Sequence, residues 1–103
     1  MSDEYRKLGR NEIGEELKHA KGWSIEKGKL HREIKFSNFE DAISFMVRAS
    51  LEVVKLDHHP EWFNVYNTLR IDLVTHDVGG ISNYDFKLAS ILNGILASYK
   101  TAH

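Results

Sequence analysis

The chain has 103 residues, of which 42% are hydrophobic and 28% charged, and its 14 basic and 15 acidic side chains leave a net charge of -1. This balance is typical of a folded globular domain and excludes disordered and fibrous proteins. A nearly neutral chain also lacks the overall field that would attract nucleic acid or an anionic membrane, so neither is an expected partner.

Length and composition predict a single domain over residues 1–103, with residues 1–8 polar and frayed. No stretch approaches the roughly 18 apolar residues of a membrane-spanning helix, and the start, MSDEYRKLGRNEIGEEL, lacks the apolar stretch of a signal peptide. The absence of cysteine excludes disulfides, thiolate metal sites and a cysteine nucleophile. We therefore expect a soluble protein of the cytoplasm.

The first third of the chain predicts a short helix followed by a β-hairpin. Asn11 can cap a helix over 11–20, and Gly22 suits its end. The segment 23–36 then alternates apolar and polar residues on either side of a turn at 26–29. This alternation is typical of a hairpin with one solvated face.

A long amphipathic helix is predicted over 38–56, where apolar residues recur every three or four positions. Ser37 with Glu40 matches a capping box at its start. Phe45 and Val54 lie away from the centre of the apolar stripe. We expect these two side chains to need a second contact, such as another subunit.

The second half of the chain predicts another hairpin and a final helix. Alternation over 62–76 indicates two strands, with a tight turn at Asn67 and Thr68. Ser82 with Asp85 forms a capping box before a helix over 83–100. The order helix, hairpin, helix, hairpin, helix predicts an α+β fold, an antiparallel sheet with one face covered by helices and with edges open to a second chain.

Three of the six histidines fall at chain turns, His58 and His59 in the stretch LDHHPEW and His76 where a later strand ends. If the strands between them pair as a hairpin, the three imidazoles converge at one end of the ladder. Pro60 fixes its own φ and biases His59 toward an extended backbone, so chain geometry sets the directions of the imidazoles.

Such a cluster allows several kinds of site. Because histidine titrates near neutrality, two imidazoles can supply a proton donor and a proton acceptor at once. Trp62 and Pro60 would add a flat apolar wall for a planar ring, and Asp57, Asp77 and Asp85 are close enough in sequence to orient the imidazoles. The residues by themselves leave open surface histidines without chemistry, acid/base catalysis and a metal site, although no HxxxH or HExxH spacing supports the metal.

The stretch LDHHPEWFNVYNTLRIDLVTHDVGGISNYDFKLAS, residues 56–90, resembles the signature region of the pterin-4a-carbinolamine dehydratase family. The resemblance extends upstream through GWSIEKGKLHREIKFSNFEDAISFMVRASL. It implies a four-stranded antiparallel sheet with three helices packed on one face, assembled as a homodimer or homotetramer. It also implies that water is removed from 4a-hydroxytetrahydrobiopterin, the spent cofactor of aromatic amino-acid hydroxylases, to give quinonoid dihydrobiopterin without a metal or an organic cofactor.

The same resemblance implies roles for individual residues. His58 and His59 match the catalytic pair and His76 the third histidine of the site, and we expect His59 to be the acid at the leaving hydroxyl group. The residues expected to contact the pterin are these three histidines together with Asp57, Pro60, Trp62, Thr75, Asp77, Val78 and Asp85. Many members carry an acidic residue four positions before the first motif histidine, where this chain has Val54, and Asp57 is the possible substitute.

Two alternative functions stay open. Some animal members of the family also act as dimerisation cofactors of a homeodomain transcription factor, which would add a nuclear location and would use the helix over 38–56 as its surface. The other alternative is a metal-dependent hydrolase at His58, His59 and His76.

Overall fold

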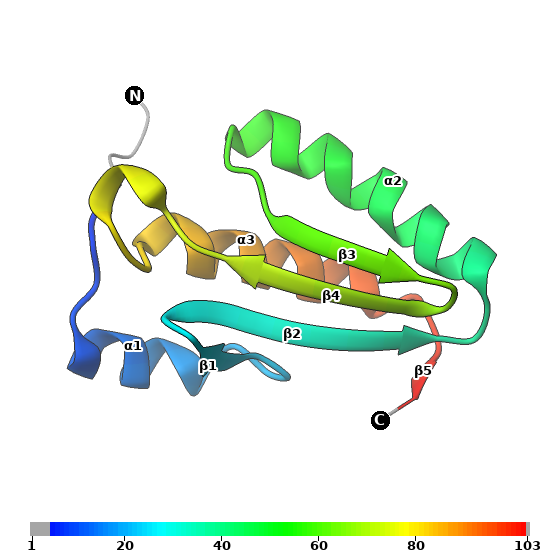
Figure 1. The fold of residues 1–103 in the computed structure, drawn as a ribbon, viewed down its shortest axis with the longest axis horizontal. Helices are drawn as coiled ribbons and strands as arrows, with labels where there is room; N and C mark the ends of the chain where they lie inside the picture. The colour runs from blue at the N-terminus through cyan, green and yellow to red at the C-terminus, as the bar shows by residue number, and fades with distance from the viewer. Residues whose placement is uncertain (1–4, 103) are drawn as a thin grey trace.

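The structure, a computed structural model, describes residues 5–102. The expected fraying of residues 1–4 lies outside this range. Figure 1 shows the order of the elements, which are α1 (Arg10–Leu17), β1 (Ser24–Glu26), β2 (Lys29–Phe36), α2 (Phe39–Leu56), β3 (Glu61–Val65), β4 (Thr68–Leu73), the 3-10 turn η1 (His76–Val78), α3 (Asn83–Leu96) and β5 (Thr101–Ala102).

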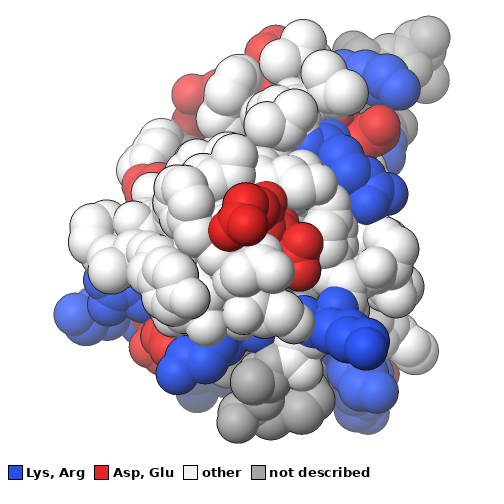
Figure 2. Space-filling view, turned by 90° about the vertical axis from the view of Figure 1, so that its right-hand side faces the viewer, with Lys and Arg blue, Asp and Glu red and all other residues white. Residues whose placement is uncertain are grey.

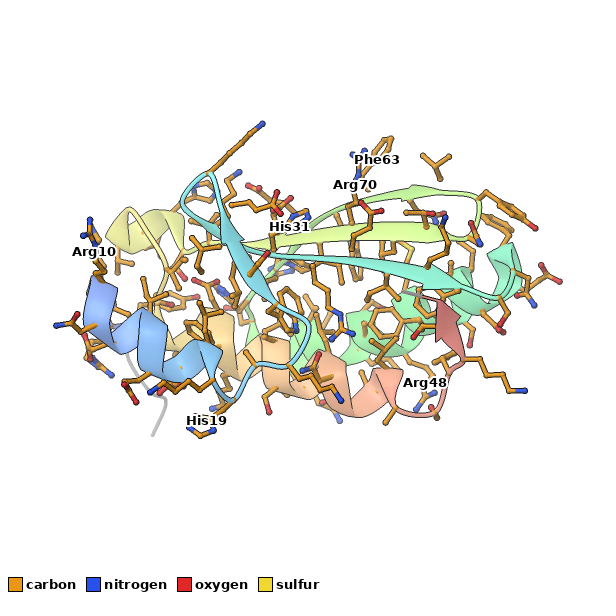
Figure 3. All side chains as sticks on the ribbon, turned by 90° about the horizontal axis from the view of Figure 1, so that it is seen from below. Arg10, His19, His31, Arg48, Phe63 and Arg70 are labelled. Carbon is orange, nitrogen blue, oxygen red and sulfur yellow. The ribbon has the colours of Figure 1, made fainter. Side chains whose placement is uncertain are left out.

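Strands β1, β2, β4 and β3 lie side by side in this order, and each neighbouring pair is antiparallel. The predicted α+β fold, with a four-stranded antiparallel sheet and three helices, is confirmed. The sheet also gains a short fifth strand that was not predicted, because β5 pairs with the end of β2. In Figure 3 the helices lie on one side of the sheet, whereas Phe63 and Arg70 project from the other side.

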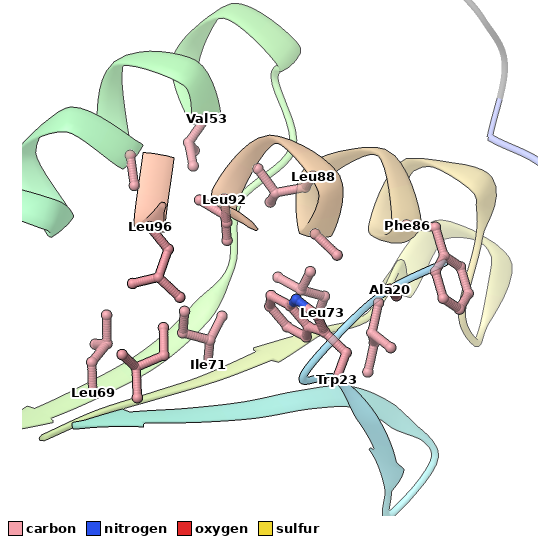
Figure 4. Close-up of a cluster of buried hydrophobic side chains, with 14 of the residues drawn as sticks. Ala20, Trp23, Val53, Leu69, Ile71, Leu73, Phe86, Leu88, Leu92 and Leu96 are labelled. Atoms are coloured by element: carbon pink, nitrogen blue, oxygen red, sulfur yellow. The ribbon is translucent and has the colours of Figure 1, made fainter. Parts of the chain in front are cut away.

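The core lies between the sheet and helices α2 and α3. Leu69, Ile71 and Leu73 of β4 have no exposed surface, and Figure 4 shows them pointing from the sheet toward Leu88 and Leu92 of α3. Burying each such side chain contributes about 1.5–3 kcal/mol. The alternation of buried and exposed residues along β4 therefore holds the helical layer on one face of the sheet.

Helix α2 begins one residue later than predicted. Asn38, not Ser37, is its N-cap, and the Asn38 side chain accepts a hydrogen bond from the backbone N–H of Asp41 at 2.8 Å. The predicted capping box of Ser37 with Glu40 is therefore wrong. The physical reason is that Asn38 keeps an extended backbone, with φ -157°, and its amide oxygen reaches the first turn directly.

Phe45 and Val54 of α2 differ from each other in their surroundings. Phe45 has no exposed surface and its ring contacts those of Phe36 and Tyr99, with centroids 5.4 and 6.0 Å apart. The expectation that Phe45 needs a second subunit is therefore wrong, because the end of β2 and the chain after α3 already cover it. Val54, in contrast, is 69% exposed.

The other two helices also differ from their predicted bounds. Helix α1 is capped by Gly9, not Asn11, since Glu12 turns back to accept from the Gly9 N–H at 3.0 Å. Helix α3 starts at the predicted box, in which Ser82 accepts from the helix backbone and Asp85 accepts from the Ser82 N–H. It ends at Leu96 instead of residue 100, because the chain turns there to add β5 to the sheet.

Residues 5–8 are ordered against the rest of the chain, so the prediction that they are frayed is wrong. The Leu8 N–H donates to the Ile81 carbonyl at 2.9 Å, and Leu8 is only 5% exposed. The β3–β4 turn also differs slightly from its prediction, since Thr68 already belongs to β4 and Tyr66 turns the chain with φ 52°.

Within residues 5–102, no helix has the length and apolar character needed to cross a membrane. Figure 2 shows one end of the molecule, where acidic and basic side chains both occur with broad uncharged surface between them.

Candidate active site

The histidine pair directly follows α2, and the way in which this helix ends separates the two imidazoles. Asp57 adopts the left-handed conformation, with φ 54°, a backbone that aspartate tolerates better than most residues. The next N–H, that of His58, donates back to the Val53 carbonyl at 3.3 Å. His58 is consequently buried, with 6% exposure, whereas His59 is exposed.

Asp85, in the first turn of α3, binds the buried imidazole. Its Oδ1 atom lies 2.5 Å from Nε2 of His58, and its Oδ2 atom accepts from the Thr75 hydroxyl at 2.9 Å and from the Ser82 N–H at 2.8 Å. A fully buried carboxylate requires such partners, and the N-terminal end of a helix favours its negative charge. The predicted capping residue therefore also fixes the orientation of His58.

The contact with Asp85 determines which nitrogen of the His58 imidazole donates a hydrogen bond. An ionised carboxylate only accepts hydrogen bonds, so Nε2 of His58 is the nitrogen that donates. In the neutral imidazole the other nitrogen, Nδ1, is then an acceptor. The pair thus leaves Nδ1 as the nitrogen of His58 that can take up a proton.

The three predicted histidines line one open hollow of about 210 Å³. Thr75 and Gly80 form a backbone bridge that closes the loop between them and places His76 and Asp77 on η1 beside the end of α2. Among the described residues the lining consists of Tyr5, Asp57, His58, His59, Val74, Thr75, His76 and Asp77.

Other predicted site residues lie outside this lining. Asp85 lies behind His58, and neither Pro60 nor Val78 borders the hollow. Trp62 pairs with Ile71 in the sheet register, so its side chain lies on the same side of the sheet as the core, against which it packs. It borders a different hollow of about 400 Å³, which is also lined by Glu26, Lys27, Lys29, His31, Glu61, Phe63, Arg70 and Asp72.

Glu61 connects the two hollows. Its Oε2 atom lies 3.3 Å from Nε2 of His76, and its Oε1 atom accepts from the Lys29 ammonium group at 2.6 Å. The hydrogen bond from Lys29 is the main cause that lowers the pKa of Glu61, partial burial opposes it, and the His76 contact lowers it further. The same bond raises the pKa of Lys29.

Sequence reasoning missed two residues of this site, Glu61 and Tyr5. Glu61 stood inside the motif, but its link to His76 depends on β3 and η1 meeting at one end of the sheet. Tyr5 carried no signal, because a short polar segment before the first helix resembles a frayed terminus. Both contacts join residues far apart in the chain.

Metal-ligating side chains are not grouped in the part of the chain that the structure describes. Within residues 5–102, no three histidine, aspartate or glutamate side chains are arranged so that they could hold one metal ion. The metal-site alternative therefore gains no support from the geometry.

A family model described as pterin 4 alpha carbinolamine dehydratase matches residues 6–95. The chain belongs to this family. Members of the pterin-4a-carbinolamine dehydratase family are hydro-lyases, enzymes that remove water from a substrate. The match spans the region from Arg6 to Ile95 in α3, including every lining residue of the histidine hollow except Tyr5.

Individual relatives agree with the dehydratase family. A protein of Solibacter usitatus (strain Ellin6076), provisionally named pterin-4-alpha-carbinolamine dehydratase, is 50% identical over 91 residues, which cover 88% of this chain and 96% of the relative. A protein of Chelativorans sp. (strain BNC1) with the same provisional name is 47% identical over 94 residues, covering 89% and 96%. The crystal structure of a transcriptional coactivator/pterin dehydratase from Brucella melitensis matches with TM-score 0.84 at 40% identity, covering 87% of this chain and 98% of that one.

Proposed function

We propose that this protein dehydrates 4a-hydroxytetrahydrobiopterin to quinonoid dihydrobiopterin and water, as a step of tetrahydrobiopterin recycling, with histidines as acid and base. The observation that carries the proposal is the placement of His58, His59 and His76 around one hollow, with His58 oriented by the buried Asp85. Family membership supports a pterin as the substrate.

The proposed reaction requires two proton transfers. The bond between C4a and its hydroxyl oxygen breaks, and that oxygen needs a proton to leave as water. The proton on N5 is lost to a base, and the electrons of that bond form the C4a–N5 double bond. A donor near the hydroxyl group and an acceptor near N5 therefore suffice, and two imidazoles can supply both.

The surroundings of the histidines favour one division of roles. His59 is exposed at the hollow, where its imidazole can exchange a proton with solvent between turnovers and serve as the acid at the leaving hydroxyl. His58, whose Nε2 is held by Asp85, has Nδ1 to accept the N5 proton. His76, beside Glu61, borders the bound ring as the third histidine.

Substrate binding falls to the remaining lining residues. Asp57 and Asp77 offer carboxylate oxygen atoms at the edge of the hollow, suited to the nitrogen-bound hydrogens of a pterin, whereas the Thr75 hydroxyl is already bonded to Asp85 and Ser82. Val54 leaves the position of the usual family acid without a carboxylate, and Asp57, three residues later and in the lining, is the carboxylate available there.

The decisive experiment follows the disappearance of 4a-hydroxytetrahydrobiopterin by absorbance. We expect His59→Ala to lower kcat roughly 100-fold to 10,000-fold, the range for loss of a general acid. The matched control is His19→Ala, because His19 is exposed and Figure 3 shows it pointing away from the molecule. Equal rates for the His59 variant and the wild type would refute the proposed mechanism.

A second candidate function is a protein-binding role in transcription. It is favoured by the similarity to the Brucella melitensis protein, which is described as a transcriptional coactivator as well as a pterin dehydratase. Helix α2 offers the surface, as Val47, Leu51 and Val54 are all more than half exposed, at 57, 61 and 69%. Co-purification of this protein from its own cells with no transcription factor attached would count against this role.

A further inference from the structure

The N-terminal segment is fastened to the start of α3. The Asn83 N–H donates to the Arg6 carbonyl at 3.1 Å, and the Arg6 N–H donates to the Asn83 side-chain oxygen at 2.7 Å. Together with the hydrogen bond from Leu8 to Ile81, these contacts hold residues 6–8 beside the helix that carries the histidine-binding carboxylate. The position of the preceding residue is therefore set by the fold.

This fastening places the Tyr5 side chain over the buried histidine. Its ring centroid lies 5.7 Å from that of His58 and 4.5 Å from that of Tyr84, which packs edge-on against it. Its hydroxyl group donates to the Asp57 carbonyl at 3.3 Å. Desolvation is the main cause that raises the pKa of Tyr5, followed by the nearby Asp57, so the hydroxyl stays a neutral donor at neutral pH.

The chemistry of the hollow gives this ring a role. Apart from Tyr5, its described lining residues are three histidines, two aspartates, one threonine and one valine. A flat bicyclic ring binds best against a flat apolar surface, for which a tyrosine ring is suited. Trp62, the aromatic residue expected to provide that surface, borders the other hollow.

We propose that Tyr5 is a substrate-binding residue that forms the aromatic wall of the histidine hollow and packs against the pterin ring. The residue lies just outside the family-matched region, which begins at residue 6. The inference rests on the proposed function, since a pterin must enter this hollow. It adds a contact supplied by the N-terminal segment, which no motif of the chain indicated.

The test compares Tyr5→Ala, Tyr5→Phe and the control Tyr66→Ala, the last at an exposed tyrosine of the β3–β4 turn. Two quantities are measured, the Kd for 7,8-dihydrobiopterin by fluorescence titration and the steady-state KM and kcat for the 4a-hydroxy substrate. For Tyr5→Ala we expect Kd and KM to rise roughly 3- to 10-fold, the range for loss of one aromatic contact, while kcat changes less. Tyr5→Phe keeps the ring, so its values should stay within about 2-fold of the wild type.

The outcomes separate this inference from the proposed function. If the wild type neither binds the dihydropterin nor turns over the substrate, the proposed function fails. If the wild type does both and Tyr5→Ala matches the Tyr66→Ala control, the function stands and the role of Tyr5 is overturned. Tyr5→Leu separates stacking from packing, because leucine preserves apolar bulk without a flat ring. A weaker Kd for the dihydropterin at an unchanged melting temperature supports the inference, and an unchanged Kd overturns it.

Discussion

The Asp85 carboxylate has two structural roles, capping α3 and orienting His58, and one side chain performs both. The Oδ2 atom completes the N-terminal cap of α3, while the Oδ1 atom holds His58. Thr75 ties the same group to the loop that leads to His76, since its hydroxyl donates to Oδ2. A change at this residue therefore disturbs helix, loop and histidine together.

Asp85→Asn tests this link at the residue scale. The side-chain oxygen of the introduced asparagine can replace one of the two carboxylate oxygens as an acceptor. The NH₂ group takes the place of the other oxygen and then faces a donor of His58, Thr75 or Ser82. We expect kcat to fall roughly 10- to 1,000-fold, because the orientation of His58 is lost. We also expect a loss of about 1.5–3 kcal/mol in the free energy of unfolding, measured in urea, because hydrogen bonds to a buried charged group are lost.

The matched control is Asp72→Asn. Asp72 also holds a histidine, His31, at 2.8 Å, but it is partly exposed and lies outside the histidine hollow. This variant should keep the wild-type kcat. If the Asp85 and Asp72 variants had equal activity, the orienting role of Asp85 would be contradicted.

At the element scale, a partly buried hydrogen-bond network joins α3, β2 and the turn after α1. The side-chain oxygen of Asn93 accepts from the Trp23 indole N–H at 2.8 Å and from the Arg32 guanidinium at 2.7 Å, while the same guanidinium nitrogen donates to the Lys21 carbonyl at 2.9 Å. Gly22 lies directly against this guanidinium group. The turn therefore depends on a residue without a side chain.

Two glycine substitutions should change stability in opposite directions. At Gly22, φ is 89° and an added Cβ would lie 2.5 Å from the Arg32 guanidinium carbon, so we expect Gly22→Ala to cost about 1–3 kcal/mol. At Gly14, inside α1, an added Cβ meets nothing within 4 Å, so Gly14→Ala should stabilise the chain by about 0.5–1 kcal/mol. Urea unfolding of both variants measures this, and a stable Gly22 variant would contradict the packing argument.

The Lys29–Glu61 pair links the starts of β2 and β3 across β4 and predicts a pH dependence of stability. The folded-state pKa of Glu61 lies below its ordinary value of 4.5, so the ionised pair stabilises the fold above that pH. The contribution is lost as the pH falls through the lowered pKa. Since both side chains are partly exposed, we expect Glu61→Gln to be slightly less stable than the wild type at pH 7, with the difference vanishing in acid. A constant difference from pH 7 to pH 3 would contradict the assignment.

At the scale of the whole molecule, one face of α2 is left exposed by the other residues that the structure describes, 5–102. Phe39, Ile43, Val47, Leu51 and Val54 are 37–69% exposed and recur at helical spacing along the whole helix. A continuous apolar stripe of this kind is typical of an interaction surface. We propose that a second copy of the chain covers it, in a homodimer or homotetramer.

Leu51→Glu tests this assembly. A charge in the middle of the stripe would be buried without a partner in an oligomer but solvated in a monomer. We expect the wild type to elute from a sizing column above the 11.9 kDa monomer, and the variant to elute as a monomer with an unchanged circular dichroism spectrum. The control Ile25→Glu, on β1, should keep the wild-type size, and a monomeric wild type would refute the proposal.

Much of the architecture could be predicted from the sequence, because helices and strands impose their own periods on apolar residues. The change from alternation to steps of three or four residues separated the hairpins from the helices. The hairpin between His59 and His76 was also predictable, and it places the start of β3 beside the end of β4. The cap of α3 was also predictable, since Ser82 and Asp85 interact within a single turn. Each of these features depends on residues that are close in sequence.

Only the tertiary structure decided which side chains meet across the chain. Tyr5 reaches His58, Trp62 lies away from the histidine hollow, and Phe45 is covered by Phe36. Asp85 was predicted as a cap and as a residue that could orient a histidine, but its hydrogen bond to His58 in particular depends on how α2 and α3 pack. These contacts span long sequence separations, so they follow from strand register and helix packing, which local spacing does not specify.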